Sequence, residues 1–266
     1  MFNHNTGKYL DIDGAKIYFE EIGSKNKPAL LLLHGGFQTI QDINPIAFFL
    51  VDDFYVIGID SRGHGKSTLG QIPLTYERMQ KDVEAILKHL RITKVSIIGF
   101  SDGGTVALRI AADNVIAVDK LISIGASWDV KELSGSEAMY NEITPESAQA
   151  MFADFYKIYI KINPEPDFNK FTAAMLGLWL DKEKTGYPNE SVAKIDSQTL
   201  LIRGDKDFLT TLTGTVTLAG MIKNAAFLNV PFAEHVVYEE QKAICKAVIK
   251  QFLTVNNSQS PGKGND

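Results

Sequence analysis

Short, continuous apolar runs recur along this chain and alternate with segments whose apolar residues follow the period of a helix. An apolar run of strand length, without polar alternation, is typical of a strand that is buried on both faces of a parallel sheet. The alternation therefore predicts βαβ units and an α/β fold with a mostly parallel sheet flanked by helices. The expected buried strands are Ala29–Leu33, Phe54–Ile59, Lys94–Gly99, Lys120–Gly125, Ser197–Arg203 and Ala225–Val230.

An opening hairpin and several helices complete the core pattern. Asp13 and Gly14 form a strong turn dipeptide before the strand-like Ile17–Ile22, so a hairpin is expected there. Helices are expected where apolar residues recur at helical spacing, at Tyr76–Leu90, Thr105–Ala112 and Lys242–Leu253.

The alternation breaks between the fourth and fifth buried strands. This interval has no convincing strand but many large apolar residues, which predicts a helical cap inserted into the α/β core. We therefore expect a core of residues 1–127 and 195–255 and a cap of residues 128–194. Residues 256–266 are rich in Asn, Ser, Gly and Pro, and they are expected to form a disordered tail.

Four aromatic residues in the predicted cap have the spacing of one helix face: Phe152, Phe155, Tyr156 and Tyr159. Such a stripe ordinarily packs against a core. It can also line a pocket for an acyl group, and both roles are compatible because a cap has an underside.

Composition and charge exclude several classes of function. The chain has 266 residues, 45% of them hydrophobic and 22% charged, as in ordinary soluble globular proteins. Its net charge is −5 with acids and bases interspersed, so nucleic acid is not an expected partner. No stretch is apolar enough to span a membrane, and the first residues do not have a signal-peptide pattern. The single cysteine, Cys245, cannot form an internal disulfide, so a cytoplasmic location is the default expectation. Nothing in the sequence specifies an oligomeric state.

The motif with the clearest chemistry is Gly-Phe-Ser-Asp-Gly-Gly at residues 99–104, which matches G-x-S-x-G. It follows an apolar run and precedes a helical pattern, which is the context that a sharp strand-to-helix turn requires. The flanking glycines let neighbouring backbone approach closely, and the N-terminus of the following helix favours a developing anion. The motif predicts Ser101 as a nucleophile.

A glycine-rich segment after the first buried strand supplies candidates for an oxyanion hole. Acyl transfer needs backbone N–H groups directed at the developing oxyanion. The N–H of Asp102, directly after the nucleophile, is one expected donor. In the segment His-Gly-Gly-Phe at residues 34–37, Gly36 is preferred over Phe37 as the second donor.

Five segments together resemble the α/β-hydrolase family in their order and spacing. They are Leu-His-Gly-Gly at 33–36, Asp-Ser-Arg-Gly-His-Gly-Lys-Ser at 60–67, the serine motif, Leu-Ile-Arg-Gly-Asp-Lys-Asp at 201–207 and Pro-Phe-Ala-Glu-His at 231–235. The resemblance runs from about Tyr9 to Leu253 and is weakest in the cap. It implies an eight-stranded sheet and a Ser–acid–His triad, with no cofactor and no metal. The serine motif is most similar to that of the valacyclovir-hydrolase-like subgroup.

The acid of the triad is expected at the end of a late strand. Asp205 and Asp207 both follow the fifth buried strand, and the family's G-x-x-D pattern places the acid at Asp207. Asp205 would then stabilise the turn, as an Asp beside Gly often does. Asp129 is a third candidate, because some relatives place the acid after an earlier strand.

The base is expected to be His235, which alone among the five histidines follows the sixth strand and precedes the last helix. The order Ser, Asp, His is the order of this fold. The other histidines have ordinary structural interpretations: His4 in the N-terminal tail, His34 as a turn hydrogen bonder, His64 in a structural loop and His89 on a helix. Relatives often have Gly where this chain has Glu234, whose carboxylate either acts on the base or faces solvent.

These residues predict a serine hydrolase that cleaves an ester, thioester or activated amide of a small to medium acyl group through an acyl-enzyme. A C–C bond hydrolase with the same triad and a small-molecule receptor on this fold are the alternatives. Phe37, Asp102 and Trp128 are expected to contact the substrate. The side chain of Asp102 either complements the helix dipole or favours a cationic group near the acyl carbonyl.

Overall fold

The computed structural model describes residues 1–254, so the predicted tail at 256–266 lies outside the described residues. Eight strands form one sheet in the order β1-β2-β4-β3-β5-β6-β7-β8. β2 pairs antiparallel with β1 and β4, and the other neighbouring pairs are parallel. This sheet confirms the predicted α/β fold. The strands are β1 (Lys8–Ile12), β2 (Ala15–Ile22), β3 (Ala29–Leu33), β4 (Tyr55–Ile59), β5 (Lys94–Phe100), β6 (Ala117–Ile124), β7 (Gln198–Gly204) and β8 (Ala225–Val230).

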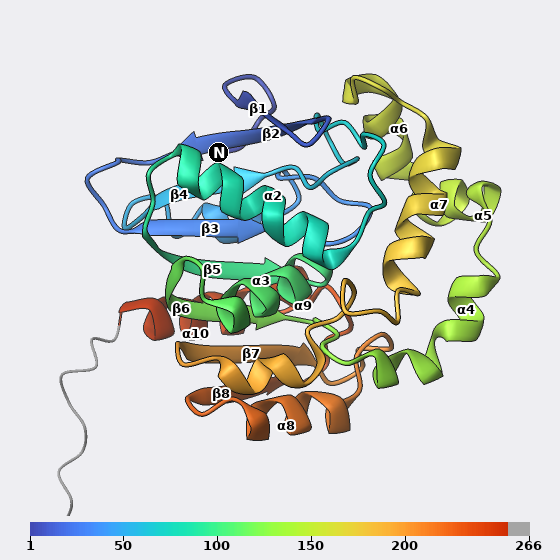
Figure 1. Cartoon of the computed structure of the whole chain (residues 1–266). Coiled ribbons are helices and arrows are strands. Elements are labelled where there is room, and N and C mark those ends of the chain that lie inside the picture. The colour runs from blue at the N-terminus through green and yellow to red at the C-terminus, as the bar shows by residue number, and fades with distance from the viewer. Residues whose placement is uncertain (255–266) are drawn as a thin grey trace, which may run out of the picture.

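Helices cover both faces of the sheet. Figure 1 shows α2, α3 and α8 on the near face, with α9 and α10 behind the strands. No helix in the described part of the chain is long and apolar enough to cross a membrane. The core helices are α1 (Asn44–Ala47), α2 (Tyr76–His89), α3 (Asp102–Asp113), α8 (Leu212–Met221), α9 (Val237–Glu240) and α10 (Lys242–Thr254).

The central strands are apolar throughout because their side chains enter two separate cores. In β3, Leu31 and Leu33 belong to the apolar cluster that includes residues of α2 and α3. Leu30 and Leu32 belong to the cluster on the opposite face, which includes residues of α10. Successive side chains of a strand point to opposite faces, so a strand covered on both sides has no polar alternation.

Two of the longer core helices differ from the sequence-based expectation, and the short helices α1 and α9 were not predicted. α3 begins at Asp102, directly after Ser101, rather than at Thr105. Its first turn contains Gly103 and Gly104, which are poor helix formers and concealed the true start. α8 was not predicted, because its Gly and Thr residues leave no clear apolar stripe.

Four helices between β6 and β7 lie beyond the carboxyl ends of the parallel strands (Figure 1). The predicted aromatic stripe is only partly one helix: Phe155, Tyr156 and Tyr159 lie on α6, but Phe152 lies in the turn between α5 and α6. Phe155 and Tyr159 are buried. They pack against Phe171 of α7, with ring centroids 5.5 and 5.2 Å away. The helices of this interval are α4 (Glu137–Asn141), α5 (Pro145–Met151), α6 (Ala153–Ile162) and α7 (Phe168–Trp179).

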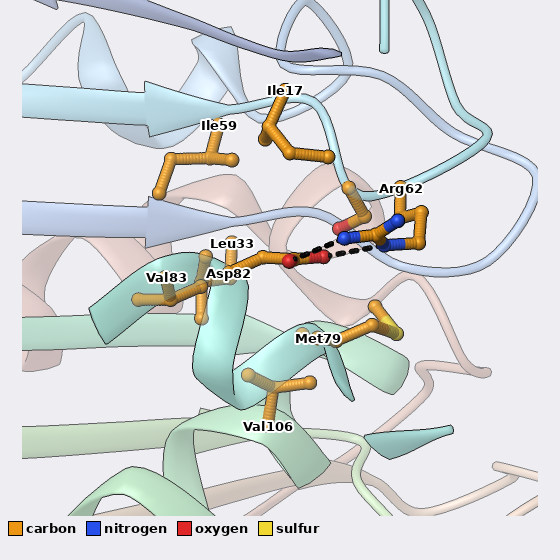
Figure 2. A pocket seen from close by; sticks show the side chains of 10 residues that line it. Ile17, Leu33, Ile59, Arg62, Met79, Asp82, Val83 and Val106 are labelled. Carbon is orange, nitrogen blue, oxygen red and sulfur yellow. Dashed lines mark hydrogen bonds and ion pairs between the residues drawn. The ribbon is translucent and has the colours of Figure 1, made fainter. Parts of the chain in front are cut away.

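A buried ion pair joins the loop after β4 to α2. Arg62 donates from Nε and Nη2 to the two carboxylate oxygens of Asp82, at 2.8 and 2.7 Å (Figure 2). Nη2 also donates to the carbonyl of Ile12 at 3.1 Å. The side chains of Arg62 and Asp82 are 0% and 3% exposed. Removing Asp82 would leave the Arg62 charge buried without compensation, whereas Asp82 also has Nε of Arg78 at 3.4 Å.

We expect Asp82→Asn to lower the free energy of unfolding by about 3–5 kcal/mol, because it leaves the Arg62 charge unpaired in the core. The double variant Arg62→Met/Asp82→Leu should cost less than Asp82→Asn, because it also removes the buried Arg62 charge. Urea unfolding measures both variants. Lys94→Ala is the control, since its pair with Asp119 is largely exposed and worth about 1 kcal/mol or less. A loss in Asp82→Asn no larger than in this control would contradict the account.

Candidate active site

Ser101 occupies a strained turn between β5 and α3. Its backbone has φ 51° and ψ −118°, a region that residues with a side chain rarely adopt. The turn requires glycine at residue 99, because a Cβ there would lie 2.2 Å from the carbonyl oxygen of Gly103. This packing directs the Ser101 side chain away from the sheet and toward the cap.

The predicted triad residues meet at the ends of three different strands. The hydroxyl of Ser101 lies 3.0 Å from Nε2 of His235, and Nδ1 of His235 lies 2.9 Å from Oδ2 of Asp207. An ionised carboxylate can only accept, so the proton of the neutral imidazole is on Nδ1. Nε2 is then the acceptor for the Ser101 hydroxyl, which is the geometry of a general base next to a nucleophile.

Asp207 is held as a carboxylate by several donors. The N–H groups of Leu209 and Thr210 donate to Oδ1, and the Thr210 hydroxyl donates to Oδ2 at 2.7 Å. Burial alone would raise the pKa of Asp207, but the hydrogen bond and charge of His235, with the Thr210 and Leu209 hydrogen bonds, lower it below its ordinary value. The group that orients His235 is therefore ionised.

The two alternative acids have other partners. Oδ1 of Asp205 accepts a hydrogen bond from the N–H of Ala233 at 3.1 Å, which ties the turn after β7 to the loop after β8. Oδ1 of Asp129 accepts from the N–H of Lys131 at 2.8 Å. Among the described residues, the carboxylate that contacts His235 is that of Asp207.

Two other histidines are structural, as their positions in the sequence indicated. His34 donates from Nδ1 to the carbonyl of Gly35 at 2.7 Å and accepts from the N–H of Ser61 at Nε2. His64 is buried, and its Nδ1 lies 3.1 Å from the carbonyl oxygen of Arg62. Neither ring contacts Ser101.

The candidate oxyanion donors lie close together beside the nucleophile. Gly36, Ser101 and Asp102 all line the same cavity. A Cβ on Gly36 would lie 2.5 Å from Oδ2 of Asp102, so no larger residue fits there. Within residues 1–254, the N–H groups of Gly36 and Asp102 make no hydrogen bond and remain available to a bound oxygen.

The side chain of Asp102 accepts hydrogen bonds from two aromatic residues, Tyr76 at the start of the core helix α2 and Trp179 at the end of the cap helix α7. The Tyr76 hydroxyl donates to Oδ1 at 2.6 Å, and Nε1 of Trp179 lies 3.1 and 3.0 Å from the two carboxylate oxygens. Burial raises the pKa of Asp102, and the Tyr76 and Trp179 hydrogen bonds oppose it only in part. No sequence motif indicated these partners, because each lies far along the chain from Asp102.

A cavity of about 830 Å³ opens over Ser101 and His235. Its walls come from loops of the core and from the cap. The two parts meet where Phe37 of the core stacks on Phe152 of the cap, with ring centroids 4.1 Å apart. Phe37 and Asp102 line this cavity as predicted. Trp128 does not, because its indole is buried and donates from Nε1 to the carbonyl of Gly214 in α8.

The described residues contain no cluster of three or more His, Cys, Asp or Glu side chains that could hold a metal ion. At the site itself, the groups brought together are the Ser101 hydroxyl, the His235 imidazole, the Asp207 carboxylate and backbone N–H groups.

Comparison with known proteins identifies relatives along most of the chain. The model of the family described as alpha/beta hydrolase fold matches residues 28–189, which is more than half of the chain. A Haemophilus influenzae protein assigned by name to the esterases or lipases is 28% identical over 250 residues, covering 87% of this chain and 85% of that protein. The proline iminopeptidase PfmaB of Pestalotiopsis fici is 23% identical over 278 residues, covering 92% and 99%. A hydrolase structure from Pseudomonas aeruginosa has the same fold, with a TM-score of 0.75 at 23% identity over 95% of this chain and 100% of that one.

We expect Asp207→Asn to disturb His235 far more than Asp205→Asn does. The amide would present the wrong hydrogen-bond partner to Nδ1 and favour the unproductive tautomer, which costs roughly 10⁴ in kcat in a serine triad. The kcat for short p-nitrophenyl esters measures the effect, with matched unfolding curves to show that both variants fold. Larger damage in Asp205→Asn would show that the acid has been placed at the wrong residue.

Proposed function

The chain belongs to the α/β-hydrolase fold family, and on that premise we propose that it is a serine hydrolase that cleaves carboxylic esters through an acyl-enzyme on Ser101. One observation carries the proposal. Ser101, His235 and Asp207 form a continuous chain of hydrogen bonds at 3.0 and 2.9 Å, and its serine end opens into the large cavity. A surface serine without catalytic use has no need for this arrangement.

The proposed reaction begins when His235 Nε2 takes the proton of Ser101 as its Oγ attacks the acyl carbonyl. Asp207 holds the imidazole in place and stabilises the imidazolium. The N–H groups of Gly36 and Asp102 bind the oxyanion of the tetrahedral intermediate. His235 then protonates the leaving alkoxide, and water, deprotonated by the same imidazole, releases the acid from Ser101.

The cavity supports a small to medium acyl substrate. Its volume of about 830 Å³ lies within the range of ordinary ligand pockets. Aromatic walls, including Phe37, Phe152 and Phe155, suit an apolar acyl chain. Relatives named for ester and for peptide substrates both occur, so comparing p-nitrophenyl esters with matched p-nitroanilides tests the choice of bond.

The charge of the cavity favours substrates that carry a cation. Its lining contains the carboxylates of five acidic residues and no lysine or arginine among the described residues. Asp102 affects the reaction most directly of the five. Its carboxylate lies beside the expected oxyanion donors and repels the negative charge that develops on the substrate. An ammonium group of the substrate next to Asp102 would offset that repulsion. The similarity of the serine motif to the valacyclovir-hydrolase-like subgroup supports the same role.

We expect Ser101→Ala and His235→Ala each to lower kcat for short p-nitrophenyl esters by a factor on the order of 10⁴–10⁶. The double variant should be little worse than either single one, because the two residues act as a unit. His89→Ala, on an exposed helix position, is the control and should keep wild-type activity. More than a tenth of wild-type activity in Ser101→Ala would overturn the assignment. If the wild-type protein turns over no acyl substrate in a broad panel, the fold serves as a receptor instead.

We expect Asp102→Asn to lower kcat/KM for α-amino esters by about 10- to 100-fold, the range expected for losing a charge-assisted hydrogen bond. The variant should retain kcat/KM for neutral esters, because the backbone N–H of residue 102 remains. The p-nitrophenyl esters of valine and of 3-methylbutanoate form a matched pair. Glu234→Gln, a more exposed cavity carboxylate, is the control and should change the ratio less. Equal losses on both esters would leave Asp102 with a helix-dipole role alone.

A further inference from the structure

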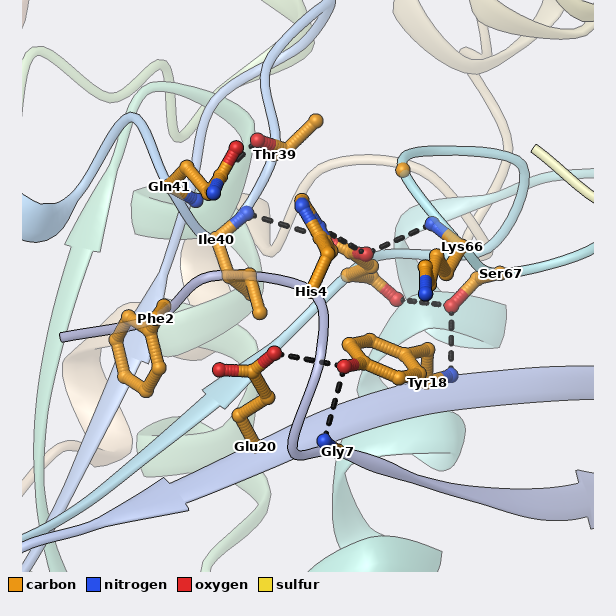
Figure 3. Close-up of polar contacts among 12 residues, drawn as sticks. Phe2, His4, Gly7, Tyr18, Glu20, Thr39, Ile40, Gln41, Lys66 and Ser67 are labelled. Carbon is orange, nitrogen blue, oxygen red and sulfur yellow. Dashed lines mark hydrogen bonds and ion pairs between the residues drawn. The ribbon is translucent and has the colours of Figure 1, made fainter. Parts of the chain in front are cut away.

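The N-terminal segment, residues 2–7, lies between residues 39–41 and the side chains of Tyr18 and Glu20 of β2 (Figure 3). Phe2 is 1% exposed, and its backbone N–H and carbonyl both bond to the side-chain amide of Asn44 at 3.0 Å. The N–H of Asn3 donates to Oε2 of Glu20, and the N–H of Gly7 donates to the hydroxyl of Tyr18. Contacts at both ends therefore fix the path of the residues between them.

His4 is the central side chain of this segment. It is buried, and its backbone has φ 60°, which a residue with a side chain adopts only when its surroundings hold it there. Its Nε2 lies 2.8 Å from Oδ2 of Asp60, at the carboxyl end of β4. The segment thus delivers an imidazole to a fully buried carboxylate.

Asp60 is bound by three N–H donors from three parts of the chain. Besides His4, the backbone N–H of Ile40 donates to Oδ1 at 2.9 Å, and that of Lys66 donates to Oδ2 at 2.8 Å. Within residues 1–254, His4 is the basic side chain that pairs with Asp60. A buried carboxylate is costly unless it is paired, so the charge on His4 matters to this cluster.

Asp60 in turn fixes the loop that carries the expected oxyanion donor. We call residues 34–43 the oxyanion loop, because it contains Gly36. At one end the loop lies against the nucleophile, since a Cβ on Gly35 would be 3.1 Å from Cβ of Ser101. At the other end, Ile40 bonds to Asp60. A shift of Asp60 would therefore move the loop relative to Ser101.

We propose that His4, as an imidazolium, is a positioning residue that holds the oxyanion loop in its active geometry through Asp60. The inference rests on the proposed function, in which the N–H of Gly36 stabilises the oxyanion. It adds a second histidine to the reaction, one that touches neither the substrate nor the reacting atoms.

The charges around His4 determine how its effect on the oxyanion loop depends on pH. The groups that face it are Asp60, Glu20 and Tyr18, the side chain of Gln41, and Lys66, whose ammonium lies over the Tyr18 ring. Burial lowers the pKa of His4, but the hydrogen bond and charge of Asp60, with the Glu20 charge and Gln41, raise it above its ordinary value. At pH values below the ordinary histidine pKa, His4 is therefore fully protonated and its contact with Asp60 stabilises the loop. This stabilisation is lost as the pH rises through the raised pKa of His4.

The test measures kcat and KM for p-nitrophenyl acetate from acid to alkaline pH in the wild-type protein, His4→Gln and the control His89→Gln. Glutamine keeps an N–H donor but cannot carry charge. We expect His4→Gln to lower kcat by about tenfold with little change in KM, as for a weakened interaction made only in the transition state. The wild type should lose kcat at alkaline pH, and this loss should be absent in His4→Gln but present in His89→Gln.

If His4 has only a structural role, His4→Gln will have a lower melting temperature but the same kcat per folded chain and the same loss of kcat at alkaline pH as the wild type. That result would overturn the proposal. If His4→Gln does not fold, NMR titration of His4 in the wild-type protein replaces it. The midpoint of that titration must coincide with the alkaline limb of kcat, and a mismatch overturns the proposal. Failure of the proposed function is distinct, because the wild-type protein would then turn over no ester, or activity would survive in Ser101→Ala.

Discussion

One imidazole connects the parts of this site, because His235 must contact Ser101 and Asp207 at the same time. The three residues follow β5, β7 and β8, so the contact forms only if the parallel strands pair in the observed order. A parallel sheet brings the carboxyl ends of its strands to one edge, where ligands of open α/β sheets bind. The apolar strands buried on both faces thus determine where the chemistry lies.

Buried carboxylates surround this edge, and their partners differ. Three pair with a basic side chain: Asp60 with His4, Asp82 with Arg62 and Asp207 with His235. Asp102 instead accepts hydrogen bonds from the neutral groups of Tyr76 and Trp179. Asp102 is therefore the one of these four that has no hydrogen bond from a basic side chain within residues 1–254. Burial raises the pKa of Asp102, and it raises that of Asp82 despite the pair with Arg62, whereas the hydrogen bond and charge of His235 lower the pKa of Asp207.

The sequence was sufficient for the sheet and for the three residues that the structure joins by hydrogen bonds, because both depend on local patterns that the chain displays directly. Apolar runs located the strands, and the segments at their ends supplied Ser101, Asp207 and His235. The pocket was harder to predict, since its walls come from distant segments with no shared motif. Trp128 was expected in the cavity, yet its indole packs toward α8, a helix without a clear apolar stripe. The bond from His4 to Asp60 likewise joins residues 56 positions apart.

The central claim is that Ser101 is a nucleophile activated by His235. Peptide mass spectrometry after reaction with a fluorophosphonate tests it most directly, because the reagent marks a serine only where a base and oxyanion donors raise its reactivity. The account predicts one adduct per chain, located on Ser101, and a much slower reaction in His235→Ala. An adduct on another serine, or an unmodified Ser101 under conditions that label an active serine hydrolase, would contradict it.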